Sequence, residues 1–179
     1  MPVSNASPKP VAGRLRSAAL ATLAARVGKM LKRHSIMLAT AESCTGGWVA
    51  QVITAIPGSS AWFERGFITY TNIAKHEMLD VPAATLRTHG AVSEPAVRSM
   101  AEGALRHSHA QISLAVSGIA GPGGATKTKP LGTVCLAWAG CGRETRSRTE
   151  HFSGDREAVR RQAVFAVLQG VLDFLHDAE

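Results

Sequence analysis

Residues 35–56 read SIMLATAESCTGGWVAQVITAI, and this stretch decides the fold. It opens with a short apolar run, Ser35 to Thr40, that is typical of a buried strand. The Gly-rich turn ESCTGG follows at Glu42 to Gly47, and Trp48 to Ile56 can form a helix that ends before Pro57-Gly58. A strand, a tight turn and a helix in this order indicate an α/β protein, in which strands and helices alternate along the chain.

The alternation continues on both sides of this unit. Apolar residues recur at helical spacing before it, which predicts an amphipathic helix over 14–34. The further strands that we expect are short runs at 62–70, 111–116, 133–139 and, nearer an edge of the sheet, 145–152. The further helices that we expect are 74–79, 82–89 and 93–107, with Ser93 as the cap of the last of these. A long last helix follows the cap Ser153-Gly154-Asp155, because the apolar residues Val159, Ala163, Val167, Val171 and Leu175 recur at steps of four.

These elements predict one α/β domain over 14–179, with three layers in the order helix, sheet, helix around a mixed central sheet. The length of 179 residues suits a single domain with a substantial core. Residues 1–13 are expected to form a disordered tail before this domain.

The formal net charge of +7 comes from one segment of the chain. Residues 1–41 carry seven of the 20 basic side chains and no acidic one, so the other 13 basic residues face 13 acidic ones. A nucleic-acid-binding face would group basic residues on the body and add aromatic side chains for stacking, but tyrosine occurs only once. We therefore expect no nucleic acid as a main partner. No membrane is expected either, because no apolar run approaches the roughly 20 residues that cross a bilayer.

The cysteines indicate neither a disulfide framework nor a metal site. Cys44, Cys135 and Cys141 are odd in number and form no C-x-x-C pair, and the chain has no H-E-x-x-H motif. We find no secretory apolar segment near the N-terminus, and we expect a cytoplasmic protein with reduced thiols.

The turn after the first strand is the sharpest candidate for a functional site. Three possible nucleophiles, Ser43, Cys44 and Thr45, stand in a row at the carboxyl end of a predicted strand, where α/β proteins gather their ligands. Free backbone N–H groups at the start of the next helix favour an anion or a developing oxyanion. The alternative is purely structural, with Ser43 or Thr45 as a helix cap and Cys44 as a small buried residue.

A second candidate, Tyr70 to Lys75 (YTNIAK), follows the expected strand 62–70. A serine hydroxyl needs a base to remove its proton, and a lysine serves once burial or nearby positive charge lowers its pKa. Tyr70 could relay a proton or orient the lysine. The alternative is that Lys75 is a solvated loop charge and Tyr70 an amphipathic plug at the strand end.

A third candidate is SGIAGPGG at Ser117 to Gly124, which also follows a buried strand. Its glycines can present several N–H groups to a phosphate, although a flexible surface loop would have the same composition. The sequence Lys127 to Pro130 follows in place of an apolar helix, so a dinucleotide-binding fingerprint is excluded. Arg156, at the start of the last helix, could bind a phosphate or a carboxylate.

Six segments, long and in the same order, resemble the CinA C-terminal domain family from about residue 20 to the last helix. The chain departs from the family pattern after Gly121, where the loop is more basic and lacks an acidic residue that is often present. The segments that carry the resemblance are TAESCTGGWVA (Thr40 to Ala50), GSSAWFERGFITYTNIAK (Gly58 to Lys75), HGAVSEPAV (His89 to Val97), SGIAGPGG (Ser117 to Gly124), KPLGTV (Lys129 to Val134) and FSGDREAVRRQA (Phe152 to Ala163).

The resemblance implies a hydrolase that converts nicotinamide mononucleotide and water into nicotinate mononucleotide and ammonia, with no metal or organic cofactor. It implies that Ser43 is the nucleophile, Lys75 the general base and Tyr70 an assisting hydroxyl. It also implies a small-molecule substrate as the partner of this site. The residues expected to contact the substrate are Cys44, Thr45, Gly46, Ser117, Gly118, Ile119, Gly121 and Arg156.

Two other functions remain open at this point. A nucleotide-binding regulatory module without catalysis, linked to competence or DNA damage, would use the same glycine loops but would have no use for a neutral lysine beside a serine. A cysteine amidase that uses Cys44 would be inactivated by iodoacetamide. We also expect a homo-oligomer, because the first and last helices could bury their apolar faces against a second subunit.

Overall fold

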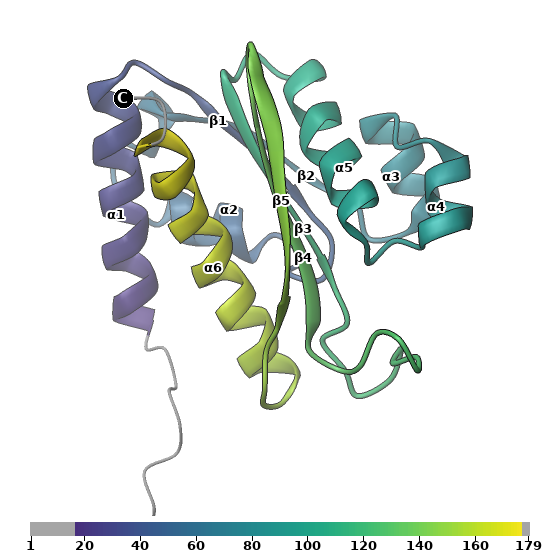
Figure 1. Ribbon diagram of the computed structural model, residues 1–179. Helices are drawn as coiled ribbons and strands as arrows, with labels where there is room; N and C mark the ends of the chain where they lie inside the picture. Colours follow the sequence, from purple (N-terminus) through teal and green to yellow (C-terminus); the bar gives the residue numbers. More distant parts are fainter. Residues whose placement is uncertain (1–16, 177–179) are drawn as a thin grey trace, which may run out of the picture.

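The computed structural model describes residues 17–176, which form one sheet between two layers of helices (Figure 1). The expected tail, 1–13, and the first residues of the expected first helix, 14–16, lie outside the described residues. The strands are β1 (Leu38–Glu42), β2 (Phe63–Ile68), β3 (Ile112–Gly118), β4 (Thr133–Gly140) and β5 (Arg143–His151). The helices are α1 (Ser17–Arg33), α2 (Trp48–Thr54), α3 (Asn72–Leu79), α4 (Ala83–His89), α5 (Glu94–Arg106) and α6 (Arg156–His176), with a short 3-10 helix, η1 (Ser59–Ala61).

The five strands stand in the order β2-β1-β3-β4-β5. The first three are mutually parallel, whereas β4 and β5 run antiparallel to their neighbours, so the predicted mixed sheet is confirmed. The polar strand β5 lies at one edge, as expected, and the partly exposed β2 lies at the other. Three parallel strands end side by side. The residues that follow β1, β2 and β3 therefore meet at the carboxyl ends of these strands, which we call the site end of the sheet.

Two hydrophobic cores, one on each face of the sheet, hold the three layers together. α1, α2 and α6 cover one face and α3, α4 and α5 the other (Figure 1). Side chains alternate between the faces along each strand, as in β4, where Leu136 faces α6 and Ala137 faces α5. The α5 face carries mainly alanines from the strands, which lets this helix pack close to the sheet.

The last helix is the clearest success of the periodicity argument. Its residues at steps of four, Val159, Ala163, Val167 and Val171, are all buried against the sheet and α1. Gly170 is required within this contact, because a Cβ atom there would lie 2.0 Å from the Trp138 ring. The apolar faces of the first and last helices therefore pack inside the chain, which removes the reason given above for expecting a homo-oligomer.

Most boundaries differ from the expected ones by one or two residues, and two of the differences have clear local reasons. The first strand starts at Leu38 and not at Ser35, because Ser35 has a positive φ of 55° and the N–H of Ile36 still donates to the carbonyl of Leu31 in α1. Ser117 and Gly118 belong to β3 and not to the following loop, because they pair with β4. Both caps predicted from hydroxyl and carboxylate side chains are confirmed: Ser93 accepts from the third residue on, and Asp155 does the same for α6.

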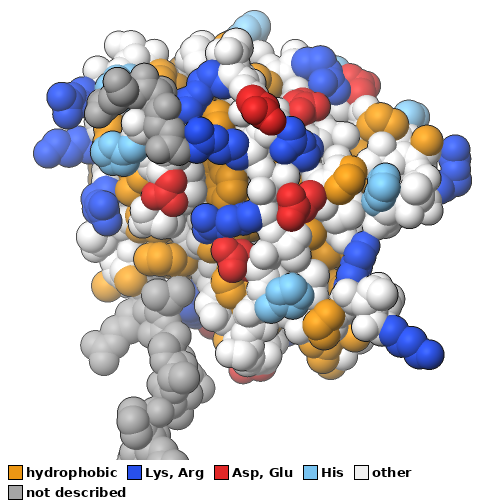
Figure 2. Space-filling model, in the orientation of Figure 1, with side chains coloured by type: hydrophobic (Ala, Val, Ile, Leu, Met, Phe, Trp, Pro, Cys, Tyr) orange, Lys and Arg blue, Asp and Glu red, His pale blue; other side chains and the backbone are white. Residues whose placement is uncertain are grey.

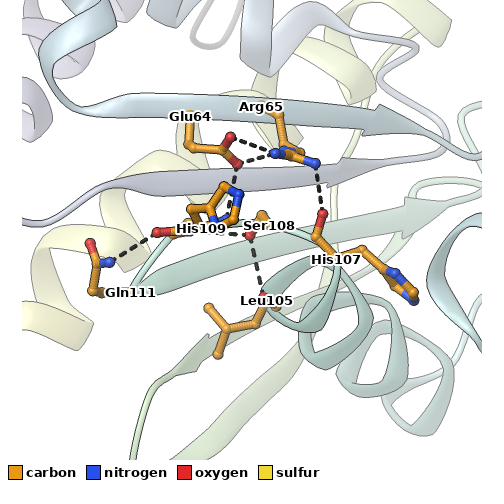
Figure 3. Close-up of polar contacts among 8 residues, drawn as sticks. Glu64, Arg65, Leu105, His107, Ser108, His109 and Gln111 are labelled. Carbon is orange, nitrogen blue, oxygen red and sulfur yellow. Dashed lines mark hydrogen bonds and ion pairs between the residues drawn. The ribbon is translucent and has the colours of Figure 1, made fainter.

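A polar cluster fastens the amino ends of β2 and β3 (Figure 3). Arg65 pairs with Glu64 and also donates to the carbonyl of His107 at 2.9 Å, just after α5. The Glu64 carboxylate accepts from the N–H of His109 at 3.3 Å, and Gln111 donates to the His109 carbonyl at 2.9 Å. The contacts tie the edge strand β2 to the turn before β3. They lie near the amino ends of the strands, away from the carboxyl ends of β1 and β3, so we assign them a structural role.

The charged surface shows no single basic area on the face drawn in Figure 2, where Lys and Arg side chains are interspersed with Asp and Glu. Among residues 17–176, no helix is long and apolar enough to cross a membrane.

Candidate active site

The register of the parallel strands brings three segments of the candidate site together. Glu42, the last residue of β1, pairs with Ile68 of β2 and with Val116 of β3. Ser43, Thr69 and Ser117 therefore occupy the next position on three neighbouring strands. Backbone hydrogen bonds continue across this level, since the N–H of Ser43 donates to Val116 at 3.0 Å and the N–H of Thr69 donates to Glu42 at 2.8 Å.

Lys75 reaches the site end of the sheet from α3. The hydroxyl of Thr71 caps α3 by accepting from the N–H of Ala74, which starts the helix directly beyond the end of β2. Side chains of a helix point back toward its N-terminus, and here that direction leads to the site end of the sheet. The Nζ atom of Lys75 lies 3.0 Å from Ser43 Oγ and donates to the carbonyl of Thr69 at 2.8 Å. Two of the three residues expected to be catalytic are thus in direct contact.

Burial weakens the hold of the Lys75 amine on its proton, because the charged form loses its hydration. Its side chain is only 1% exposed, and this desolvation lowers the pKa of Lys75 below its ordinary value. A negative charge on Cys44 would act in the opposite direction, but burial raises the pKa of the Cys44 thiol to about 12, so that charge is absent near neutral pH. A lysine that is a solvated loop charge would have neither feature, and that alternative is wrong.

Cys44 is poorly suited to act as a nucleophile. It is buried in the core between the sheet and α2, and its raised pKa keeps it in the thiol form, whereas the thiolate is the reactive species. Ser43 next to it is 8% exposed and touches the lysine. The geometry favours the hydroxyl over the thiol.

Glu42 organises the turn in a way that the sequence did not reveal. Its carboxylate is fully buried and accepts four hydrogen bonds, from the Thr45 hydroxyl at 2.7 Å and from the N–H groups of Gly47, Val49 and Ala50 at 2.8–3.0 Å. The N–H groups at the start of α2 are therefore already used, and the expectation that they are free for an anion is wrong. The expected cap is wrong as well, because Gly47 and neither hydroxyl is the N-cap of α2.

Arg160 is a second residue that sequence reasoning missed. It lies on α6, and its guanidinium donates from Nε to the carbonyl of Cys44 at 3.0 Å and from Nη2 to the carbonyl of Thr45 at 2.9 Å. A signal existed, since Arg160 stands one helical turn after Arg156 and on the same face, but nothing in the sequence links α6 to this turn.

Arg156 joins the second and third candidate segments. It donates to the hydroxyl of Tyr70 at 2.9 Å and to the carbonyl of Gly121 at 2.8 Å. The Tyr70 ring is 58% exposed, so the tyrosine lies at the rim of the site with its hydroxyl on Arg156. Arg156 thus links the phenol of Tyr70 to the glycine loop.

The glycine loop is only partly available to a ligand. The N–H of Ile119 donates to Thr133 and its carbonyl accepts from Gly132, both at 2.8 Å, so its backbone continues the pairing with β4. Gly118 is required by packing, because a Cβ atom there would lie 2.6 Å from Val134. Of the expected contact residues in this segment, Ser117 lies at the same level as Ser43 in the strand register, and Gly121 bonds to Arg156 through its carbonyl.

Two further observations concern ligands. Within residues 17–176 no group of three or more His, Cys, Asp or Glu side chains is placed to hold a metal ion. A cavity of about 330 Å³ lies near the amino ends of β1 and β3, away from Ser43. It is lined by His34, Ile36, Gln111, Ile112, Cys141, Arg143 and Leu175.

The fold and the site define a class of protein: a three-layer α/β domain with a buried serine–lysine pair where parallel strands end. Residues 20–175 match the model of the CinA C-terminal domain. The chain belongs to this family.

Relatives and solved structures agree with this assignment. The nicotinamide-nucleotide amidohydrolase PncC of Escherichia coli (strain K12) is 56% identical over 150 residues, which cover 84% of this chain and 91% of that protein. The protein of the same name from Pseudomonas putida is 51% identical and covers 86% of this chain and 95% of its own length. The crystal structure of the competence/damage inducible protein CihA from Agrobacterium tumefaciens has a TM-score of 0.84 at 42% identity, with 88% of this chain and 95% of that chain covered.

Proposed function

We propose that this protein is a nicotinamide-nucleotide amidohydrolase, which converts nicotinamide mononucleotide and water into nicotinate mononucleotide and ammonia. Relatives that carry this name align over most of their length and of this chain. The observation that carries the proposal is the contact between Lys75 and Ser43, because a buried amine beside a serine hydroxyl suits attack on an amide. A regulatory nucleotide-binding module would gain nothing from that pair.

In the first half of the reaction, Ser43 Oγ bonds to the carboxamide carbon while its proton passes to the neutral Nζ of Lys75. The Thr69 carbonyl accepts a hydrogen bond from the same amine and so turns the amine's lone pair toward the serine. The tetrahedral intermediate then collapses, the carbon–nitrogen bond breaks, and Lys75 returns the proton to the leaving nitrogen. Ammonia departs and an ester remains on Ser43.

In the second half, water replaces ammonia. Lys75 takes a proton from the water while its oxygen bonds to the ester carbon, and the proton returns to Ser43 Oγ as the carbon–oxygen bond breaks. Nicotinate mononucleotide leaves and the neutral amine is restored. The positive charge of the substrate's pyridinium ring makes the carbonyl carbon more electrophilic, so the reaction needs no metal or organic cofactor.

We call residues 43–47, which carry Ser43, the nucleophile turn. The substrate enters, in this proposal, between this turn and the rim formed by Tyr70 and Arg156. The Arg156 guanidinium supplies positive charge for the 5′-phosphate, and Ser117 and Gly121 are the proposed contacts to the rest of the nucleotide. Tyr70 assists by holding Arg156, since its hydroxyl is engaged there.

We also propose that the protein acts in the cytoplasm and that it forms a homo-oligomer. Three large apolar side chains near the site, Ile68, Tyr70 and Ile73, are more than half exposed, and a second subunit would cover such residues. Light scattering on the purified full chain distinguishes an oligomer from a monomer.

The purified chain, incubated with nicotinamide mononucleotide, should release ammonia and nicotinate mononucleotide in equal amounts. In water labelled with ¹⁸O, one labelled oxygen should enter the product carboxylate. Intact mass spectrometry after rapid acid quenching should detect the ester on the wild type and none on Ser43→Ala. Absence of ammonia release would refute the activity, and an ester on the Ser43→Ala protein would refute the nucleophile.

A further inference from the structure

The carbonyls of the nucleophile turn are fixed by a side chain from the other end of the chain. Arg160 donates two hydrogen bonds to two successive carbonyls, those of Cys44 and Thr45. Its guanidinium also lies 5.2 Å from the centre of the Trp48 ring, which restricts the arginine from the side of α2. The fork geometry of an arginine suits this double contact, because the two hydrogen bonds come from two different nitrogens and a lysine has only one.

These contacts determine where the N–H of Thr45 points. The N–H and the C=O of a trans peptide point in opposite directions, and the peptide between Cys44 and Thr45 is trans. Since the Cys44 carbonyl faces Arg160, the N–H of Thr45 faces away from Arg160.

That N–H is left without a partner. Thr45 is fully buried, yet its backbone N–H donates to no acceptor within residues 17–176. The next N–H, of Gly46, is already used, because it donates to the carbonyl of Ser43 at 3.0 Å. A buried unpaired N–H costs free energy, so its presence in a folded protein needs an explanation, and a catalytic role is one of those known.

We propose that Arg160 is a positioning residue, which holds the N–H of Thr45 ready to donate to the oxyanion that forms when Ser43 attacks the amide. The inference rests on the proposed function, because it needs a tetrahedral intermediate on Ser43. It assigns a role to a residue that does not touch the substrate. The positive charge on the carbonyl side also polarises the Cys44–Thr45 peptide and makes its N–H a stronger donor.

The test compares Arg160→Lys and Arg160→Ala with Arg161→Ala, in the full chain with nicotinamide mononucleotide as substrate. Arg161 is a matched control: it is the next residue of α6, lies 5.1 Å from the same Trp48 ring and bonds to Glu157, not to the turn. Both Arg160 variants should lose about 10²-fold in kcat, the scale of one displaced oxyanion donor, with little change in KM. Arg161→Ala should stay within a few-fold of the wild type in both constants.

Two readouts separate positioning from a general loss of structure. Added guanidinium ion should partly restore kcat in Arg160→Ala and leave Arg161→Ala unchanged. The pH at which the rate is half-maximal should be the same in Arg160→Lys as in the wild type, because the base is Lys75. Equal kcat in the Arg160 and Arg161 variants, or a loss confined to KM, would overturn the inference. An inactive wild type would instead overturn the proposed function.

Discussion

The amine of Lys75 lies 3.0 Å from the hydroxyl of Ser43, although 32 positions separate the two residues in the chain. The contact exists because β1 and β2 are parallel neighbours that end at the same level, and α3 starts just past β2. Thr69 directly follows the last residue of β2, and its backbone carbonyl accepts a hydrogen bond from the Lys75 amine. The contact between serine and lysine is therefore built from two strand ends and one short helix.

Replacement of either member of the pair should abolish most of the activity. We expect Ser43→Ala and Lys75→Met each to lower kcat for ammonia release by about 10³-fold or more, and the double variant to be little worse than either single one. Lys75→Arg should be as inactive as Lys75→Met, because an arginine keeps its proton at any pH of the assay. Substantial ammonia release by Lys75→Met would exclude this lysine as the base.

The rate should rise with pH as Lys75 loses its proton. Since burial lowers the pKa of Lys75, the midpoint of this rise should lie below the ordinary lysine value of about 10.4. The measurement is kcat/KM over a range of pH, which reports the free enzyme. A rate that does not change until pH approaches 10.4 would contradict a buried neutral amine.

The same titration predicts how stability depends on pH. Between the lowered pKa of folded Lys75 and about 10.4, the unfolded chain binds more protons than the folded one, so the free energy of unfolding gains from this residue as pH rises. Urea titrations of the wild type and Lys75→Met across this window isolate the effect, because every other group is common to both. The difference between the two proteins should shift in favour of the wild type as pH rises, and a constant difference would show an unperturbed lysine.

Cys44 should be dispensable and slow to react. Iodoacetamide should modify the exposed Cys141 first and leave Cys44 as a thiol, because burial raises the pKa of Cys44 to about 12. We therefore expect the treated enzyme to keep most of its activity, and Cys44→Ala to do the same. Peptide mapping identifies the modified residue, with Cys141→Ser as the control. Loss of activity in step with labelling of Cys44 would move the nucleophile by one position.

Glu42 should matter for stability as well as for activity. Glu42→Gln places an amide N–H₂ group where the site has only donors, so it should lower the free energy of unfolding by about 2–3 kcal/mol. Glu77→Gln is the matched control, because Glu77 is an exposed residue of α3. Equal urea midpoints for the two variants would show that the carboxylate does not hold the turn.

The sequence by itself determined the class of fold and the order of its elements. Periodicity placed the last helix, the hydroxyl and carboxylate caps placed the starts of α5 and α6, and the polar pattern placed β5 at an edge. These features are local, since each depends on residues a few positions apart that act through backbone geometry. The motifs at Ser43, Lys75 and Arg156 were visible for the same reason, because each lies just after a strand or in the first turn of a helix.

Only the tertiary structure decided what these motifs do to one another. The sequence of residues 42–47 does not reveal that the Glu42 carboxylate accepts hydrogen bonds from the N–H groups at the start of α2. It also does not reveal that Arg160 of α6 bonds to the carbonyls of the same turn. Nor does it show that Cys44 is buried in the core while Ser43 meets a lysine. Burial, desolvation and hydrogen bonds between distant segments depend on how strands align and layers pack, and these are properties of the assembled chain and not of any one segment.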